Sequence, residues 1–193
     1  MNSASVKPVP RHQCLIYSGP PSDQLKSLAL HIRKRLDANY RCLYLNSPQM
    51  VAGIRGYLTS SGLDVHAAVT AGRLILSSDQ DHLVHGVFDA ERMLDMLKGE
   101  IARALADGYA GLWASGDMAW EFGPERDFGK LEEYERALEE IFRTQPALCG
   151  VCQYHADTLP DEAVKMGMTL HPGVYVNETL SRVNNEYVKL AAE

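Results

Sequence analysis

Several features that mark specialised classes of protein are missing from this sequence. Its 19 lysines and arginines are outnumbered by 25 acidic residues, which gives a net charge of −6 and excludes the basic surplus of a nucleic-acid-binding protein. Four cysteines in 193 residues are too few for a disulfide scaffold. No apolar run approaches the ~18–20 residues that span a bilayer, and the N-terminal segment has no signal-peptide core. We therefore expect a cytoplasmic protein that binds neither nucleic acid nor membranes.

The composition that remains is that of an ordinary globular domain. Hydrophobic residues make up 46% of the chain and charged residues 23%, and a chain of this length can bury a single sizeable core. Residues 1–11 contain two prolines and no periodicity, which predicts a flexible tail. Each cysteine has apolar neighbours, as expected for buried, reduced thiols.

Short apolar runs alternate with amphipathic segments along the rest of the chain. This alternation predicts a three-layer α/β fold, in which a mostly parallel sheet is flanked by helices. A terminal helix over residues 178–193 is predicted from the spacing of Leu180, Val183, Tyr187 and Leu190. The predicted strands are 13–18, 41–45, 74–76, 109–115, 148–154 and 174–177, and the predicted helices are 22–36, 48–62, 89–105, 130–143 and 161–166.

Ligands of such sheets bind beyond the carboxyl ends of the strands, so the segments that follow the strands matter most. A phosphate-binding loop after the first strand would need free backbone N–H groups, glycines and a lysine. The segment from Tyr17 to Asp23 has instead two prolines and one glycine, and no lysine comes before Lys26. We expect no nucleotide at this position and no enzymatic activity, while other cofactors stay open.

The fourth long strand runs into a glycine turn that presents Asp117 close to Trp120. These two residues either belong to a ligand pocket, or they are a helix cap and an aromatic cover of the core edge. The sequence does not decide between these interpretations.

Cysteine and histidine pairs raise the question of a metal or redox site. Cys149 and Cys152 lie three residues apart on a predicted strand, so their side chains face opposite sides and cannot bind one ion together. His12 and Cys14 face the same side of the first strand. They form either a packed pair or part of a metal site completed from elsewhere, for example by Cys152 or His171. The glutamates of the predicted helix 130–143 are interpreted as a mostly solvated face.

An ordered set of short motifs gives the chain a family resemblance. These motifs are His12–Tyr17, His85–Asp89, Gly116–Trp120, Glu133–Glu135, Cys152–Tyr154 and His171-Pro172. With them the chain resembles, from about Arg11 to Asn177, the MEDS family, the methanogen/methylotroph DcmR-type sensory domain.

The resemblance implies a RecA/KaiC-like fold, related to P-loop NTPases, without a functional phosphate-binding loop. It also implies a sensory domain over residues 12–177 that responds to small molecules, for which hydrocarbon derivatives have been proposed. Family members are often fused to DNA-binding or histidine-kinase modules. Because only residues 178–193 follow the matched region, we expect signalling to a histidine kinase or transcription regulator in trans, or through homo-oligomerisation.

Three functional hypotheses follow. The leading one is an effector site at the strand carboxyl ends, formed by Tyr17, Phe88, Asp117, Met118, Trp120, Tyr154 and His171. The first alternative is a ligand-free interaction module derived from an inactive ATPase fold, which would dock a partner through Leu180 and Tyr187. The second alternative is a metal- or thiol-based sensor that uses His12, Cys14 and Cys152.

Overall fold

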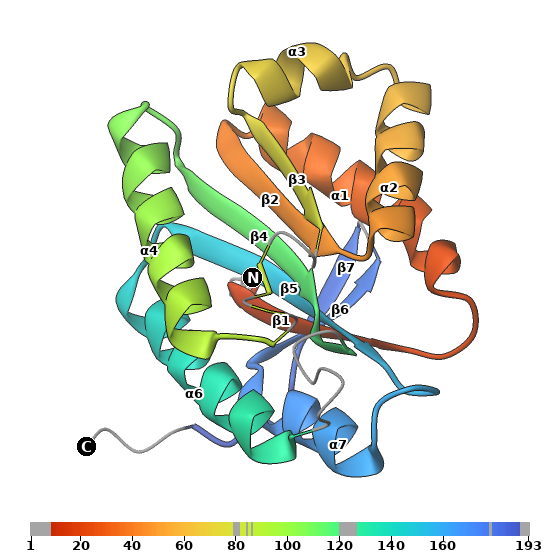
Figure 1. Cartoon of the computed structure of the whole chain (residues 1–193), viewed down its shortest axis with the longest axis vertical. Helices are drawn as coiled ribbons and strands as arrows, with labels where there is room; N and C mark the ends of the chain where they lie inside the picture. The colour runs from red at the N-terminus through yellow and green to blue at the C-terminus, as the bar shows by residue number, and fades with distance from the viewer. Residues whose placement is uncertain are drawn as a thin grey trace, which may run out of the picture.

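The computed structural model describes residues 9–78, 82–83, 85, 87–119, 127–177 and 179–189. A central β-sheet lies between two layers of helices (Figure 1). The predicted three-layer α/β fold is therefore confirmed. Within the described residues, no helix is both long and apolar enough to cross a membrane.

The sheet contains seven strands in the part of the chain that is described. All neighbouring strands are parallel except the last pair along the chain, which is antiparallel. The strands are β1 (His12–Tyr17), β2 (Tyr40–Asn46), β3 (Leu74–Ser78), β4 (Gly111–Asp117), β5 (Leu148–His155), β6 (Gly173–Asn177) and β7 (Leu180–Val183). Their spatial order is β3-β2-β4-β5-β1-β6-β7.

Helices cover both faces of the sheet (Figure 1). One face carries η1 (Pro21–Gln24), α1 (Leu25–Asp37), α2 (Pro48–Ser60) and α3 (Val65–Thr70), and the other carries α4 (Ala90–Ala106), α6 (Phe128–Thr144) and α7 (Asp161–Leu170). Several helices begin at a residue whose side chain caps the first turn, as the sequence predicted for Ser47 and Asp89. Ser47 and Asp89 accept hydrogen bonds from the backbone N–H groups of Met50 and Arg92, which satisfies donors that the first helical turn leaves unpaired.

Each face of the sheet has its own hydrophobic core, because side chains alternate along a strand. On β5, Cys149 packs into the core beneath α1 and α2, whereas Cys152 packs into the core beneath α4, α6 and α7. The prediction that these two cysteines face opposite sides is confirmed.

The predicted helix over residues 178–193 is wrong for the described residues. The side-chain Oδ1 of Asn177 accepts hydrogen bonds from the backbone N–H groups of Thr179 and Leu180, which turns the chain back on itself. Residues 180–183 then pair with β6 as an antiparallel strand, and Asn184–Lys189 have no regular structure. The helical spacing of Leu180 and Val183 is overridden because the edge of β6 offers backbone partners. Leu190 lies outside the described residues.

Candidate functional site

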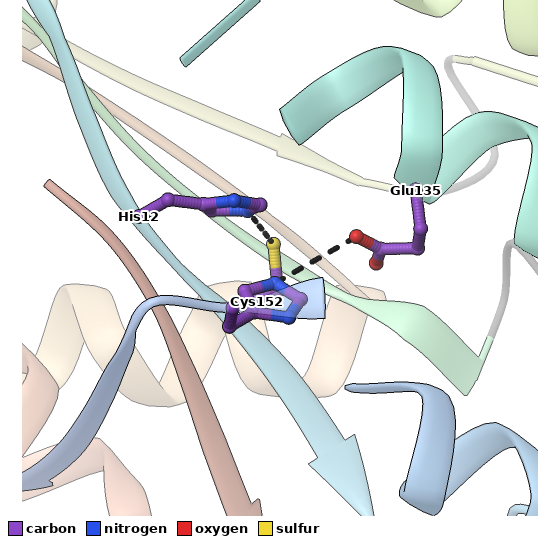
Figure 2. A group of neighbouring side chains, drawn as sticks. His12, Glu135 and Cys152 are labelled. Carbon is purple, nitrogen blue, oxygen red and sulfur yellow. Dashed lines mark hydrogen bonds and ion pairs between the residues drawn. The ribbon is translucent and has the colours of Figure 1, made fainter. Parts of the chain in front are cut away.

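Four side chains with metal-ligand chemistry meet beneath α6 and α7. We call His12, Glu135, Cys152 and His171 the buried centre: one ligand atom from each lies within 4.8 Å of all the others. Each residue is at most 4% exposed. Figure 2 shows His12, Glu135 and Cys152 pointing toward one another from a strand, a helix and a second strand.

Strand register explains how residues far apart in sequence come together. Strands β1 and β5 pair in parallel with His12 opposite Gly150 and Cys14 opposite Cys152, so these side chains share one face of the sheet. Helix α6 crosses this face and contributes Glu135, and His171 is the residue that ends α7. Four separate elements therefore supply the buried centre.

The hydrogen bonds of the two imidazoles determine where their lone pairs point. Nδ1 of His171 donates to the carbonyl oxygen of Gly167 (2.7 Å), and Nδ1 of His12 lies 2.5 Å from Oε2 of Glu139. Each neutral ring therefore carries its proton on Nδ1 and an acceptor lone pair on Nε2. Nε2 of His12 lies 3.4 Å from Sγ of Cys152, and Nε2 of His171 lies 3.7 Å from Oε2 of Glu135.

A second ring of polar groups holds the buried centre in place. The Tyr154 hydroxyl donates to Oε1 of Glu135 (2.6 Å), and the Tyr187 hydroxyl donates to Oε1 of Glu139 (2.7 Å). Nδ2 of Asn184 donates to the carbonyl oxygen of His171 (2.8 Å). The irregular C-terminal segment, residues 184–189, is thus bound to the centre directly at His171, and indirectly through Glu139, which contacts His12.

Ring packing fixes the orientation of His12. Its imidazole stacks on Phe142 with a centroid distance of 3.9 Å and tilts against His171 at 4.0 Å. A Cβ atom on Gly150 would approach the Phe142 ring to 3.2 Å. Glycine at position 150 therefore leaves the space in which Phe142 supports His12.

Burial controls the ionisation of the centre. It raises the pKa of Glu135 to about 7, although the hydrogen bond from Tyr154 acts in the opposite direction. It lowers the pKa of His12 to about 3, and it lowers that of His171 well below the usual value, with the adjacent His12 adding to the shift. Both imidazoles are neutral at pH 7, which is the form that binds metal ions.

A small cavity adjoins the buried centre. Its volume is about 30 Å³, and it lies between the sheet and helices α4 and α6. Cys152 belongs both to its wall and to the buried centre. The cavity is lined by apolar side chains that include Leu45, Leu97, Met118, Leu138 and Phe142.

The structure divides the predicted effector site between the two faces of the sheet. Tyr154 and His171 meet at the buried centre, and Met118 lines the cavity beside it. Phe88 packs edge-on against Tyr134, another residue of the cavity wall, with ring centroids 5.1 Å apart.

Two predicted effector residues lie away from this group. Tyr17 packs into the core of the opposite face and stacks on His155, with ring centroids 4.9 Å apart. Asp117 follows the same alternation on β4 as Trp113, which belongs to that opposite core, and its Oδ1 accepts a hydrogen bond from the N–H of Ala119. Trp120 lies outside the described residues.

The predicted metal or thiol residues also separate. His12 and Cys152 belong to the buried centre, whereas Cys14 does not. The thiol of Cys14 instead faces the carbonyl oxygen of Gly173 at 3.6 Å, and burial raises its pKa to about 12.

Two glutamates of the site were misassigned from the sequence. The acidic helix was predicted to be mostly solvated, and Glu133 and Glu140 are exposed, but Glu135 and Glu139 are 0% and 2% exposed. A signal was present: both glutamates fall on the helical stripe of apolar residues that includes Leu131 and Leu138. A carboxylate at a core position of an amphipathic helix indicates a buried partner.

The hydrogen bond between Tyr187 and Glu139 gives a first prediction. Replacing Tyr187 by Phe leaves a buried carboxylate oxygen without its donor, so we expect the free energy of unfolding to fall by about 1.5–3 kcal/mol. Urea titration measures this change. Tyr57→Phe is the control, because Tyr57 is 44% exposed and its replacement should change stability by less than about 0.5 kcal/mol. Equal effects of the two substitutions would contradict the prediction.

Comparison with known proteins gives one family. The family model of MEDS, the methanogen/methylotroph DcmR sensory domain, matches residues 11–172. No curated protein sequence matches the chain.

Solved structures share the fold at low sequence identity. A KaiC-like protein from the hyperthermophilic archaeon Pyrococcus horikoshii OT3 is 12% identical, with a TM-score of 0.55, and the match covers 86% of this chain and 70% of that one. The flagellar accessory protein FlaH from Methanocaldococcus jannaschii is 14% identical, with a TM-score of 0.55 and coverages of 86% and 71%. These likenesses show a RecA/KaiC-like fold.

Proposed function

Because the chain belongs to the MEDS family of sensory domains, we propose that it senses a small hydrocarbon derivative that binds in the cavity beside Cys152. The observation that carries this proposal is the pairing of an apolar cavity with a polar group at one wall. Apolar walls with a few polar groups are typical of small-molecule sites, in which the polar groups orient the ligand. A volume of about 30 Å³ suits a molecule of one or two carbon atoms.

The loop after β1 supports a ligand other than a nucleotide. The backbone N–H of Gly19 donates to the Asp157 carboxylate (2.7 Å), and the carbonyl oxygen of Gly19 lies 2.9 Å from Nε2 of His155. A phosphate at this loop would have to displace a carboxylate and would be repelled by it. The ligand that we propose is therefore not a nucleotide bound at this loop.

Helix α6 is the element through which an effector would act. It supplies Tyr134, Leu138 and Phe142 to the cavity. It also supplies Glu135 to the buried centre and Glu139 to the polar groups around it. An effector shifts a conformational equilibrium only as far as it binds one state better than the other. A ligand that holds α6 against the sheet would also hold Glu139 against Tyr187, and so would stabilise the C-terminal segment, which we propose as the surface that signals to a partner.

The proposed function is tested with chloromethane, methanol and ethanol as probes. We expect at least one of them to cause saturable chemical-shift changes in the methyl signals of Met118 and Leu138, measured by NMR on ¹³C-labelled protein. Ala114 lines the cavity, and Ala114→Val fills part of it with two methyl groups. This variant should weaken probe binding at least about tenfold, since it removes the space for a ligand.

Ala52→Val is the matched control, because Ala52 is exposed on α2, which covers the opposite face of the sheet from the cavity. It should bind the probes as the unchanged chain does. Absence of binding by all three probes, or equal binding by the Ala114→Val variant, would contradict the proposal.

A further inference from the structure

We infer that the buried centre is a transition-metal site that takes Zn²⁺, with Nε2 of His12, Nε2 of His171, Sγ of Cys152 and Oε2 of Glu135 as ligands. The inference deepens the proposed function, on which it rests for the role of the site, by naming a cofactor at the wall of the effector cavity. Four observations support it independently of any family property.

The first observation is a pair of buried acceptors that face each other. His171 has its proton on Nδ1, which is bound to Gly167, so its Nε2 presents a lone pair to Oε2 of Glu135 at 3.7 Å. Neither Nε2 of His171 nor Oε2 of Glu135 has a hydrogen-bond partner among the described residues, and both residues are 0% exposed. Two lone pairs repel each other in a medium of low dielectric constant, so this arrangement favours a positive charge between them, which a proton on Glu135 or a metal ion can supply.

The second observation is the set of groups behind the ligands. Histidines that bind metal ions usually donate their other ring N–H to a carboxylate or a backbone carbonyl. His12 meets the Glu139 carboxylate in this way, and His171 meets the Gly167 carbonyl. The Glu135 carboxylate is oriented in a similar way. Tyr154 donates a hydrogen bond to its Oε1, so that Oε2 points toward Nε2 of His171.

The third observation is distance. Ligands at the usual Zn–N, Zn–O and Zn–S bond lengths of about 2.0–2.3 Å lie roughly 3.3–3.8 Å apart at the corners of a tetrahedron. The separation between His12 Nε2 and Cys152 Sγ is 3.4 Å, and that between His171 Nε2 and Glu135 Oε2 is 3.7 Å. Since all four ligand atoms lie within 4.8 Å of one another, small side-chain movements complete a tetrahedron.

The fourth observation is the chemistry and charge of the donors. Two imidazoles, one thiolate and one carboxylate suit Zn²⁺, whereas Mg²⁺ and Ca²⁺ prefer sites made only of oxygen atoms. A thiolate and a carboxylate contribute two negative charges, which a divalent cation neutralises inside the core. Binding releases the thiol proton of Cys152, and the proton of Glu135 when it is present, to the solvent.

The test uses the whole chain, freed of metal by a chelator, then loaded with Zn²⁺ or Co²⁺ and dialysed against metal-free buffer at pH 7.5. After dialysis of the Zn²⁺-loaded chain we expect one equivalent of Zn²⁺ to remain bound, as measured by elemental mass spectrometry. Co²⁺ should give the visible bands of a tetrahedral site and a near-ultraviolet band from charge transfer between thiolate and cobalt. Cys152→Ala should remove the charge-transfer band and weaken Zn²⁺ binding at least about 100-fold.

Cys149→Ala is the matched control, since Cys149 lies on the same strand, is equally buried, and faces the opposite core. It should keep full metal content and the unchanged Co²⁺ spectrum. The inference is overturned if the unchanged chain retains no Zn²⁺, if Co²⁺ gives no thiolate band, or if Cys149→Ala loses metal as Cys152→Ala does. Should Cys152→Ala fail to fold, the Co²⁺ spectrum of the unchanged chain decides.

These measurements test the metal-site proposal and the effector proposal independently of each other. Retained Zn²⁺ without probe binding would support the metal site and contradict the effector proposal. Probe binding by a chain that retains no Zn²⁺ would contradict the metal site alone.

Discussion

A Glu135→Gln variant is expected to fold normally and to bind Zn²⁺ at least about 100-fold more weakly than the unchanged chain. Glutamine keeps the hydrogen bond from Tyr154, which its amide oxygen accepts, and its amide nitrogen presents a donor to Nε2 of His171, which lies 3.7 Å from Oε2 of Glu135. It supplies neither the negative charge nor a good oxygen ligand for the metal. Competition with a chromophoric chelator measures the affinity, and an affinity within about threefold of the unchanged chain would contradict the assignment of Glu135 as a ligand.

The same substitution should change how stability depends on pH in the metal-free protein. The pKa of Glu135 is raised from 4.5 to about 7 on folding, so its contribution to stability is fully present below pH 4.5 and is lost as pH rises through 7. The difference in pKa corresponds to about 3 kcal/mol. Glutamine does not ionise, so the stability of Glu135→Gln relative to the unchanged chain should rise between pH 4.5 and about 7 and stay constant above that.

The two histidines act in the opposite direction. Their pKa values are lowered on folding, so the stability they contribute is present above pH 6.5 and is lost as pH falls below it. Between pH 4.5 and 6.5 the histidines and Glu135 therefore oppose each other, and the difference in stability between the two proteins isolates Glu135. Urea unfolding of both proteins with a chelator at pH 4.5, 6 and 8 tests this. A difference that stays constant from pH 4.5 to 8 would contradict the raised pKa of Glu135.

A Gly150→Ala variant is expected to lose about 3 kcal/mol or more of its free energy of unfolding. A Cβ atom at this position would lie 2.3 Å from the backbone oxygen of Ala114 and 3.2 Å from the Phe142 ring. The first contact involves the neighbouring strand itself, so no side-chain rotation can relieve it. Moving Phe142 would also remove the ring on which His12 stacks, so metal binding should weaken as well.

Gly56→Ala is the control for the glycine prediction. Gly56 lies in α2, and a Cβ atom there would meet nothing within 4 Å. Alanine favours the helix, so this variant should gain about 0.5–1 kcal/mol. Thermal and urea unfolding of the two variants measure the difference. A loss below about 1 kcal/mol for Gly150→Ala would mean that the strands separate more easily than the structure implies.

Local patterns were sufficient for the fold class. Strand runs that are apolar on both sides, separated by amphipathic segments, require a parallel sheet with helices on both faces, and the structure has this sheet. Ser47 and Asp89 were recognisable as helix starts because a cap bonds to backbone groups only two or three residues away. The opposite orientation of Cys149 and Cys152 followed from the alternation of a strand.

The C-terminal segment shows where local pattern fails. Leu180 and Val183 have helical spacing, but the edge of β6 offers unpaired backbone groups, and Asn177 turns the chain toward them. The periodicity of a short segment carries little free energy compared with a row of backbone hydrogen bonds. The availability of that edge depends on the assembled sheet, so no window of sequence contains the information.

The sequence by itself determined the sheet, the layers of helices, the turns that cap them, and the family motifs in which His12, Glu135, Cys152 and His171 stand. Tertiary structure alone decided that these four residues form one centre, while Tyr17 and Asp117 lie with the opposite core. It also placed Glu135 and Glu139 in the interior. The physical reason is the separation along the sequence of the residues in contact. Secondary structure follows from contacts within a few residues, whereas the buried centre depends on the register of β1 with β5 and on the packing of α6 and α7 across these strands.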